Sequence, residues 1–291
     1  MSIYPDKKAV KALAFDLDGT LLGPGAVLTD RALKAVKSCQ ARGIRIIVST
    51  GRAIESSEHF RALLGAEGPM IYFNGAVIAD MPSGKILKST LLSIQAAEFC
   101  VDLAREMGVY CQIYFPAGVC PAGIKPAAFG EKCILAAERD APELEFYHDK
   151  TGIKAELCDL KKALKEPGLE GCVKAMFLTE PEIQTGLRQR LEERFGEALY
   201  ITSSARTYLE VLNANVSKGR GLKFVMECLS LKSEEVIAFG DEENDSPMFD
   251  VAGFSVAPSN AKDSVKARAN LVTGSNAEDG VAAFLEEFFG V

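Results

Sequence analysis

The sequence predicts an α/β fold, a doubly wound parallel sheet, with a second α+β domain inserted into it. Two observations carry this prediction. Strand and helix patterns alternate through residues 1–82 and again through 213–291, whereas residues 83–212 group several strands around two helices. With 291 residues, the chain is also long enough for two domains. We therefore expect a core domain formed by 1–82 and 213–291, interrupted by an inserted domain at 83–212.

The first part of the core begins with a short apolar strand at 11–16. A helix is expected from about Thr29 to Gly43, then a buried strand at 44–48 and a helix that ends at Leu64. The apolar run 70–78 predicts a third strand, which turns at Asn74-Gly75. Strands that alternate with helices in this way indicate a parallel sheet.

The last part of the chain repeats this order. A helix opens at 216–219, a strand covers 236–239, and a short helix, a strand at 254–257 and a terminal helix at 276–289 follow. The two ends of the chain are therefore expected to share one sheet.

The insert has a different pattern. A helix at 93–107 is capped by Ser93 and stopped by Gly108, and a second helix runs from Pro181 to Phe195. The expected strands are 109–115, 172–178, 198–203 and 207–212, and 116–130, with three prolines and three glycines, is the clearest irregular loop. Strands in such runs with a few helices indicate an α+β sheet with helices on one face.

Composition excludes several classes of function. The formal net charge of −7 argues against nucleic acid as a partner, because phosphate-backbone binding depends on Lys and Arg. No segment approaches the length of a membrane span or has the pattern of a signal peptide. The eight cysteines are scattered and form no C-x-x-C pair, which predicts reduced thiols rather than disulfides or a zinc site. We expect a cytoplasmic protein with no membrane partner; its oligomeric state is unknown, and a monomer fits.

The segment from Lys11 to Thr20 ends a buried strand with Asp16, Asp18 and a glycine. Residues two apart in a strand point to the same face, so the two carboxylates repel unless a cation lies between them. Mg²⁺ suits a site with few carboxylates. An acidic turn after an edge strand, with ordinary Asp-Gly turn chemistry, explains this decapeptide equally well.

Polar residues also follow two other predicted strands: Ser49-Thr50-Gly51-Arg52 and Asp241 to Asp245. Lys218 lies at the start of a helix in the same half of the chain. Each has an ordinary structural explanation, as a turn, a helix cap or a solvated lysine. Ligand sites of open α/β sheets lie beyond the carboxyl ends of the strands, so we expect all of these residues to converge.

Taken together, these motifs resemble the haloacid dehalogenase superfamily of phosphotransferases. They read Asp16-Leu-Asp18-Gly-Thr, Thr50-Gly-Arg, Lys218-Gly and Gly240-Asp-x-x-Asn244-Asp245. Asn74-Gly75-Ala76 and Asn276-Ala-Glu-Asp-Gly280 are similar to the Cof-type subfamily. The insert lies between the Thr50 and Lys218 motifs, as in members with a C2 (type IIB) cap. One departure is Val256-Ala-Pro-Ser-Asn260-Ala, where relatives commonly have methionine and glycine in place of the proline and serine.

The resemblance implies a mechanism. Asp16 would attack phosphorus and form an aspartyl-phosphate, and Asp18 would act as general acid and base. Mg²⁺ would be held by the Asp16 carboxylate, the Asp18 backbone carbonyl and Asp241. The substrate phosphate would be bound by Thr50, Gly51, Lys218 and Asn244, and Asp245 would orient these groups from behind.

The implied activity is a Mg²⁺-dependent phosphatase for small phosphorylated metabolites, with sugar phosphates as the first guess. Superfamily branches that pump ions or dehalogenate lack the second aspartate, and Asp18 is present here. A phosphomutase on a hexose phosphate uses the same core and remains an alternative. A non-catalytic protein that binds a phosphorylated ligand is the more distant one.

The strand at 109–115 offers candidates for substrate selection by the insert. Tyr110, Gln112 and Tyr114 share one face, and the apolar residues between them share the other, which we expect to pack on helices. The polar face is expected to look toward the core site; a solvated sheet face explains it equally well. Arg206 is a weaker candidate for binding a second phosphate or a carboxylate.

Overall fold

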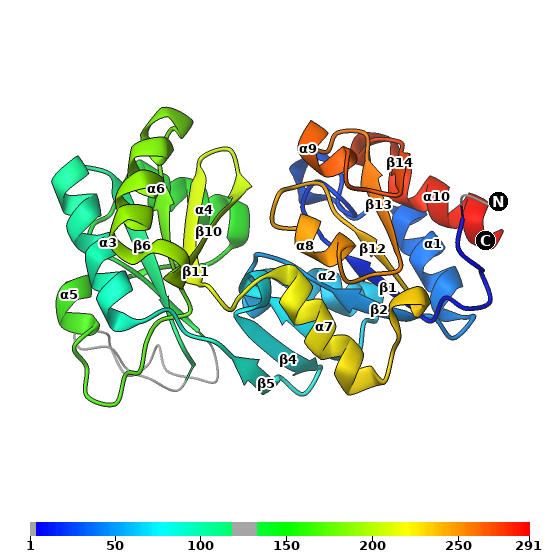
Figure 1. Cartoon of the computed structure of the whole chain (residues 1–291), viewed down its shortest axis with the longest axis horizontal. Coiled ribbons are helices and arrows are strands. Elements are labelled where there is room, and N and C mark those ends of the chain that lie inside the picture. The colour runs from blue at the N-terminus through cyan, green and yellow to red at the C-terminus, as the bar shows by residue number, and fades with distance from the viewer. Residues whose placement is uncertain (1–3, 118–132) are drawn as a thin grey trace. The chain divides into compact units, whose positions relative to one another are not determined.

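The structure is a computed structural model, and it describes residues 4–117 and 133–291. The chain divides into two compact units (Figure 1). Unit 1 comprises Met1–Gly51, Ser57–Leu87 and Ser217–Val291, and unit 2 comprises Arg52–Ser56 and Lys88–Val216. No helix among the described residues is long and apolar enough to cross a membrane.

Unit 1 is built on a parallel sheet of five strands in the order β14-β13-β12-β1-β2. Strands from both ends of the sequence alternate with helices, so the predicted doubly wound α/β fold is confirmed. The strands are β1 (Ala12–Phe15), β2 (Arg45–Val48), β12 (Val236–Phe239), β13 (Phe254–Pro258) and β14 (Leu271–Thr273).

Helices cover both faces of this sheet. On one face, small residues such as Ala14 and Ala238 pack with apolar side chains of α7 (Lys218–Leu229), α8 (Ser246–Phe249) and α9 (Asp263–Lys266). On the other face, the ring of Phe239 packs edge-on against Phe284 of α10 (Gly280–Phe289), which lies beside α1 (Asp30–Gln40). Alternation along each strand therefore divides the core into two layers.

The run expected as one strand at 70–78 differs from the prediction. It forms two antiparallel strands, β3 (Gly68–Tyr72) and β4 (Val77–Met81), which are joined at Phe73–Gly75 and continued by β5 (Lys85–Ser89). Asn74 adopts a φ of 58°, in the left-handed region that favours asparagine and glycine. The turn chemistry of Asn74-Gly75 reverses the chain completely instead of bending one strand. Ser49, just after β2, still bridges Ile71 of β3 in parallel.

Unit 2 contains a six-stranded sheet in the order β10-β11-β9-β6-β7-β8. All its pairings are antiparallel except that of β7 with β8. Its strands are β6 (Tyr110–Phe115), β7 (Ile134–Ala137), β8 (Glu156–Leu157), β9 (Lys174–Leu178), β10 (Leu199–Ala205) and β11 (Tyr208–Asn213). Its helices are α3 (Ile94–Met107), α4 (Pro142–Thr151), α5 (Leu160–Ala163) and α6 (Pro181–Phe195), and α2 (Ile54–Leu64) crosses the division between the units.

The two faces of the unit 2 sheet differ in chemistry. Cys111, Ile113 and Phe115 of β6 join the apolar core that contains residues of α3, α5 and α6, as expected from their alternation. The other face is polar and contacts α4, whose Tyr147 hydroxyl lies 2.8 Å from that of Tyr114. Most of the irregular loop at 116–130 lies outside the described residues.

Candidate active site

The carboxyl ends of three neighbouring strands of unit 1 bring the predicted residues together. Phe15 is in register with Val48 on one side and with Phe239 on the other. The backbone N–H of Asp16 donates to Phe239 O at 3.0 Å, and that of Ser49 donates to Phe15 O at 2.8 Å. The residues that follow β1, β2 and β12 therefore start from one edge of the sheet.

Lys218, the first residue of α7, links two carboxylates at this edge. Its Nζ lies 2.5 Å from Asp16 Oδ1 and 2.6 Å from Asp245 Oδ1. All three side chains are buried. A solvated lysine at a helix start is therefore the wrong interpretation of Lys218.

Asp245 also organises the backbone after β12. Its Oδ2 accepts hydrogen bonds from the N–H groups of Asp241 and Glu242, at 2.9 and 3.0 Å. With both oxygens engaged, Asp245 fixes the position of Lys218 and the path of the loop that carries Asp241. The orienting role predicted for Asp245 from the resemblance stays a prediction, and these contacts are compatible with it.

Asp241 contacts the loop that follows β1. Thr20 Oγ1 donates to Asp241 Oδ1 at 2.6 Å, and both residues are buried. Gly19 has a φ of +81°, and a Cβ at this residue would lie 2.2 Å from Asp241 Oδ2. Only glycine therefore fits at position 19, where the loop backbone passes close to the Asp241 carboxylate.

An amide pair completes the site. Asn244 Nδ2 donates to Asn74 Oδ1 at 2.9 Å, and Asn244 Oδ1 is a buried acceptor without a hydrogen-bond partner in the described part of the chain. Asn74 was not among the predicted site residues. The Asn74-Gly75 dipeptide, which the sequence shows as a turn, is the signal that could have indicated Asn74.

Thr50 lies beside this pair. It is buried, its N–H donates to Ile71 O, and its carbonyl accepts from the N–H of Asn74 at 3.0 Å.

Three carboxylates lie close enough to hold one metal ion. One oxygen from each of Asp16, Asp241 and Asp245 lies within 4.8 Å of the others, and all three residues are buried. The Asp18 carboxylate is not part of this group. The resemblance implies that Asp18 would bind the ion through its backbone carbonyl instead. One ammonium among three carboxylates leaves negative charge in a buried place, which favours a divalent cation.

The electrostatics of the site follow from this excess of acid. Burial raises the pKa of Asp16 well above its usual range; Lys218 opposes this rise, and Asp245 and Asp241 add to it. Burial and the charge of Asp245 raise the pKa of Asp241 to about 7. Burial acts to lower the pKa of Lys218, but Asp16 and Asp245 outweigh it and raise that pKa, so Lys218 keeps its proton.

The candidates in unit 2 lie on its sheet. Tyr110, Gln112 and Tyr114 are all buried, so an exposed, solvated face is wrong for them. The Tyr110 hydroxyl donates to Gln112 Oε1 at 3.1 Å, and Gln112 Nε2 has no hydrogen-bond partner among residues 4–117 and 133–291. Arg206 is exposed in the turn between β10 and β11.

The same face holds a charged pair that the sequence interpretation did not include. Lys174 Nζ lies 2.7 Å from Glu210 Oε1 and 5.6 Å from the centre of the Tyr114 ring, and both charged residues are buried. Ser204 Oγ also donates to Glu210 Oε1, at 3.0 Å. Single charges within the apolar strands 172–178 and 207–212 are the signal that could have indicated them.

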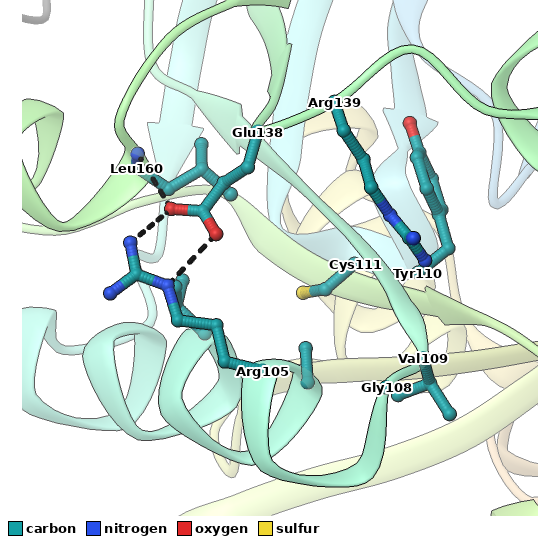
Figure 2. A pocket seen from close by; sticks show the side chains of 10 residues that line it. Arg105, Gly108, Val109, Tyr110, Cys111, Glu138, Arg139 and Leu160 are labelled. Atoms are coloured by element: carbon teal, nitrogen blue, oxygen red, sulfur yellow. Dashed lines mark hydrogen bonds and ion pairs between the residues drawn. The ribbon is translucent and has the colours of Figure 1, made fainter.

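Unit 2 also contains a cavity of about 260 Å³, which is lined by residues of α3, of the start of β6, of the segment just after β7 and of α5 (Figure 2). Figure 2 shows Arg105 joined to the carboxylate of Glu138 on one side and Arg139 beside Tyr110 on the other. Of the predicted site residues, Tyr110 lines this cavity.

Known proteins resemble this chain over nearly its whole length. A family model described as haloacid dehalogenase-like hydrolase matches residues 13–285. The chain is 29% identical over 291 residues to the 5-amino-6-(5-phospho-D-ribitylamino)uracil phosphatase YwtE of Bacillus subtilis, covering 96% of this chain and 98% of the relative.

Solved structures show the same fold. The crystal structure of TM0651 from Thermotoga maritima matches with a TM-score of 0.77 and 27% identity over 96% of this chain and 97% of that one. The structure of BT4131, described as a subclass IIB sugar phosphatase of the haloacid dehalogenase superfamily, matches with a TM-score of 0.79 over 97% of this chain and 100% of that one. At 19% identity it speaks for the fold alone.

The resemblance found in the sequence motifs is confirmed, and so are the fold class and the assignment as an enzyme, a phosphoric monoester hydrolase. With its family model spanning residues 13–285 and its acidic site built from the matching motifs, the chain belongs to the haloacid dehalogenase-like hydrolases.

Proposed function

We propose that this protein is a Mg²⁺-dependent phosphatase that hydrolyses small phosphorylated metabolites, with sugar phosphates as the first candidates. The observation that carries the proposal is the buried arrangement in which Lys218 Nζ contacts both Asp16 and Asp245 while the carboxylate of Asp241 lies within reach of the same metal ion. A nucleophilic carboxylate beside a fixed cation and a metal site is what phosphoryl transfer requires.

The residues fit Mg²⁺. The group contains only oxygen donors, which hard cations prefer, and the buried acceptor Asn244 Oδ1 can receive a hydrogen bond from a water on the ion. Asp16 and Asp241 would hold the ion with the backbone carbonyl of Asp18, because both oxygens of Asp245 are already engaged. When bound, Mg²⁺ neutralises the charge between the nucleophile and the phosphate.

The side chains would take the roles that the family resemblance implies. An oxygen of Asp16 forms a bond to phosphorus as the bond from phosphorus to the ester oxygen breaks, and Asp18 gives its proton to the departing alkoxide. Asp18 then takes a proton from the water that attacks phosphorus, and the bond from phosphorus to the Asp16 oxygen breaks, which releases phosphate and restores the carboxylate. Thr50, Gly51, Lys218 and Asn244 bind the phosphoryl oxygens.

The insert at 83–212 would act as a cap that selects the substrate. Support comes from the polar face of its sheet, where Tyr110, Gln112, Tyr114 and the Lys174–Glu210 pair provide donors and acceptors without net charge. A buried polar group of this kind suits a neutral, hydroxyl-rich leaving group better than a charged one. The relative YwtE is named for a substrate with a phosphorylated ribityl chain, which belongs to this chemical class.

The test is phosphate release from a panel of sugar, nucleotide and cofactor phosphomonoesters, with Mg²⁺ and with chelator. Asp16→Asn is expected to abolish release, since the amide is a poor nucleophile. Asp250→Asn is the matched control, because Asp250 lies in the same unit but pairs with Arg268 at the surface. Release that needs neither metal nor Asp16 would overturn the proposal, and no release from any ester would turn attention to mutase assays.

A further inference from the structure

The loop that follows β1 is held from outside by two asparagines. Asn260 Nδ2 donates to Gly19 O at 2.8 Å, and Asn276 Nδ2 donates to Leu22 O at 2.9 Å. The two asparagines are joined to each other, because the N–H of Asn276 donates to Asn260 Oδ1 at 2.8 Å. Residues far apart in the sequence thus form one clamp over the loop 17–23.

This loop determines where the carboxylate of Asp241 lies. The Gly19 backbone passes so close that a Cβ there would be 2.2 Å from Asp241 Oδ2, and Thr20 donates to Asp241 Oδ1 at 2.6 Å. A displacement of the loop by a fraction of an ångström therefore moves the oxygens of Asp241 or breaks the bond from Thr20.

The clamp rests on a fixed support. Thr29 Oγ1 donates to Asp279 Oδ1 at 2.6 Å, which ties the start of α1 to the turn before α10. In the same turn, a Cβ at Gly280 would lie 1.8 Å from Gly274 O, so the two backbones are in direct contact. The segment 274–280 therefore holds Asn276 in place, which gives the Asn276-Ala-Glu-Asp-Gly280 motif a physical role.

We propose that Asn260 and Asn276 are positioning residues for the metal site: they hold the loop 17–23 so that Gly19 and Thr20 fix Asp241 in the geometry that binds the divalent cation. This inference rests on the proposed function. Neither asparagine touches the carboxylates, so both act through the loop. Groups that hydrogen-bond directly to metal ligands change metal affinity by about 10- to 100-fold when they are removed, so residues that act one step further out are expected at the lower end of this range.

The experiment measures Mn²⁺ binding by electron paramagnetic resonance, without substrate, on chelator-treated full-length protein. Asn260→Ala and Asn276→Ala are each expected to raise the Mn²⁺ dissociation constant roughly tenfold. Because the two residues share a hydrogen bond, the double variant should lose less than the product of the two single effects.

Asn270→Ala is the matched control. Asn270 is also an exposed asparagine of unit 1 whose Oδ1 accepts two hydrogen bonds, from Ser255 N and Oγ at 2.8 and 2.9 Å, but it does not contact the loop 17–23. Its loss should lower the melting temperature about as much as Asn260→Ala and leave Mn²⁺ affinity unchanged.

Unchanged Mn²⁺ affinity in both asparagine variants overturns the inference, as does an equal loss of affinity in Asn270→Ala. A kinetic readout separates positioning from damage: at saturating metal the kcat of Asn260→Ala should return close to that of the unaltered protein. An unaltered protein that binds Mn²⁺ but releases no phosphate would refute the proposed function alone, and the binding comparison would still decide the role of the asparagines.

Discussion

The substitution Asp241→Asn tests whether the acidic site destabilises the metal-free fold. Asn can still accept the hydrogen bond from Thr20 through its side-chain oxygen, and the backbone bonds of residue 241 to Asp245 and Lys262 are unaffected. The change therefore removes one buried charge with little loss of contacts.

Burial raises the pKa of Asp241 from 3.8 to about 7 in the folded protein. A carboxyl whose folded pKa is raised contributes stability that is complete below pH 3.8 and is lost as the pH rises through about 7. The shift corresponds to a cost of about 4 kcal/mol at pH 8 and about 2 kcal/mol at pH 5. In metal-free protein, Asp241→Asn should recover most of this cost at pH 8, which is a rise in melting temperature on the order of 10 °C.

Differential scanning calorimetry with chelator at pH 8 and pH 5 is the assay, with Asp250→Asn as control. We expect the variant to exceed the unaltered protein clearly at pH 8 and less at pH 5. Adding Mg²⁺ at pH 8 should stabilise the unaltered protein and not the variant. The reasoning is refuted if the variant melts no higher than the unaltered protein at pH 8 with chelator while the latter shows no gain on acidification.

Three further outcomes are expected. Lys218→Met leaves Asp16 and Asp245 buried without their cation, so it should abolish phosphate release and destabilise the protein by about 3–5 kcal/mol. A variant that calorimetry shows to be as stable as the unaltered protein contradicts the ion network. Lys174→Met should alter the ranking of esters in the phosphate-release panel through loss of its contact with Glu210, and a ranking identical to that of the unaltered protein argues against a role of this face in selection. In a thiol-labelling assay of native protein, Cys228→Ser should remove one fast-reacting thiol, because Cys228 is exposed. By contrast, burial raises the pKa of Cys39 to about 11 and that of Cys133 to about 12, so these thiols should react slowly. Equal fast labelling of the variant and the unaltered protein would contradict the exposure of Cys228.

The parallel sheet and its site were predictable because they depend on local patterns. The three central strands of the parallel sheet, β1, β2 and β12, are short and mostly apolar runs, and the polar residues that matter come soon after each of them. Strand ends alone therefore bring Asp16, Thr50 and Asp241 together. The position of Lys218 followed in the same way from its place at a helix start. What the pattern left open was whether its ammonium is solvated or buried between two carboxylates.

The features that escaped prediction depend on which strands pair with each other. The sequence does show Asn74-Gly75 as a turn, but the direction in which the chain continues is set by the pairing of β3 with β4. Lys174 and Glu210 lie 36 residues apart, and only the sheet order, with β9 next to β11, places them in contact. Periodicity assigns each charge to a face of a strand and does not say what lies across from it.

The hydrogen bonds of the clamp act against the electrostatic repulsion between the carboxylates of the site. Three buried carboxylates share one ammonium, so they repel each other, and a movement of the loop after β1 that let water reach Asp241 would relieve this repulsion. A loop held only by its own backbone would yield to that force, since the first segment to open is the one with the fewest contacts. The bonds from Asn260 and Asn276 oppose the movement at Gly19 and Leu22, on the two sides of Thr20. On the proposed role of the two asparagines, this movement is prevented and the negative charge stays where it would bind a divalent cation.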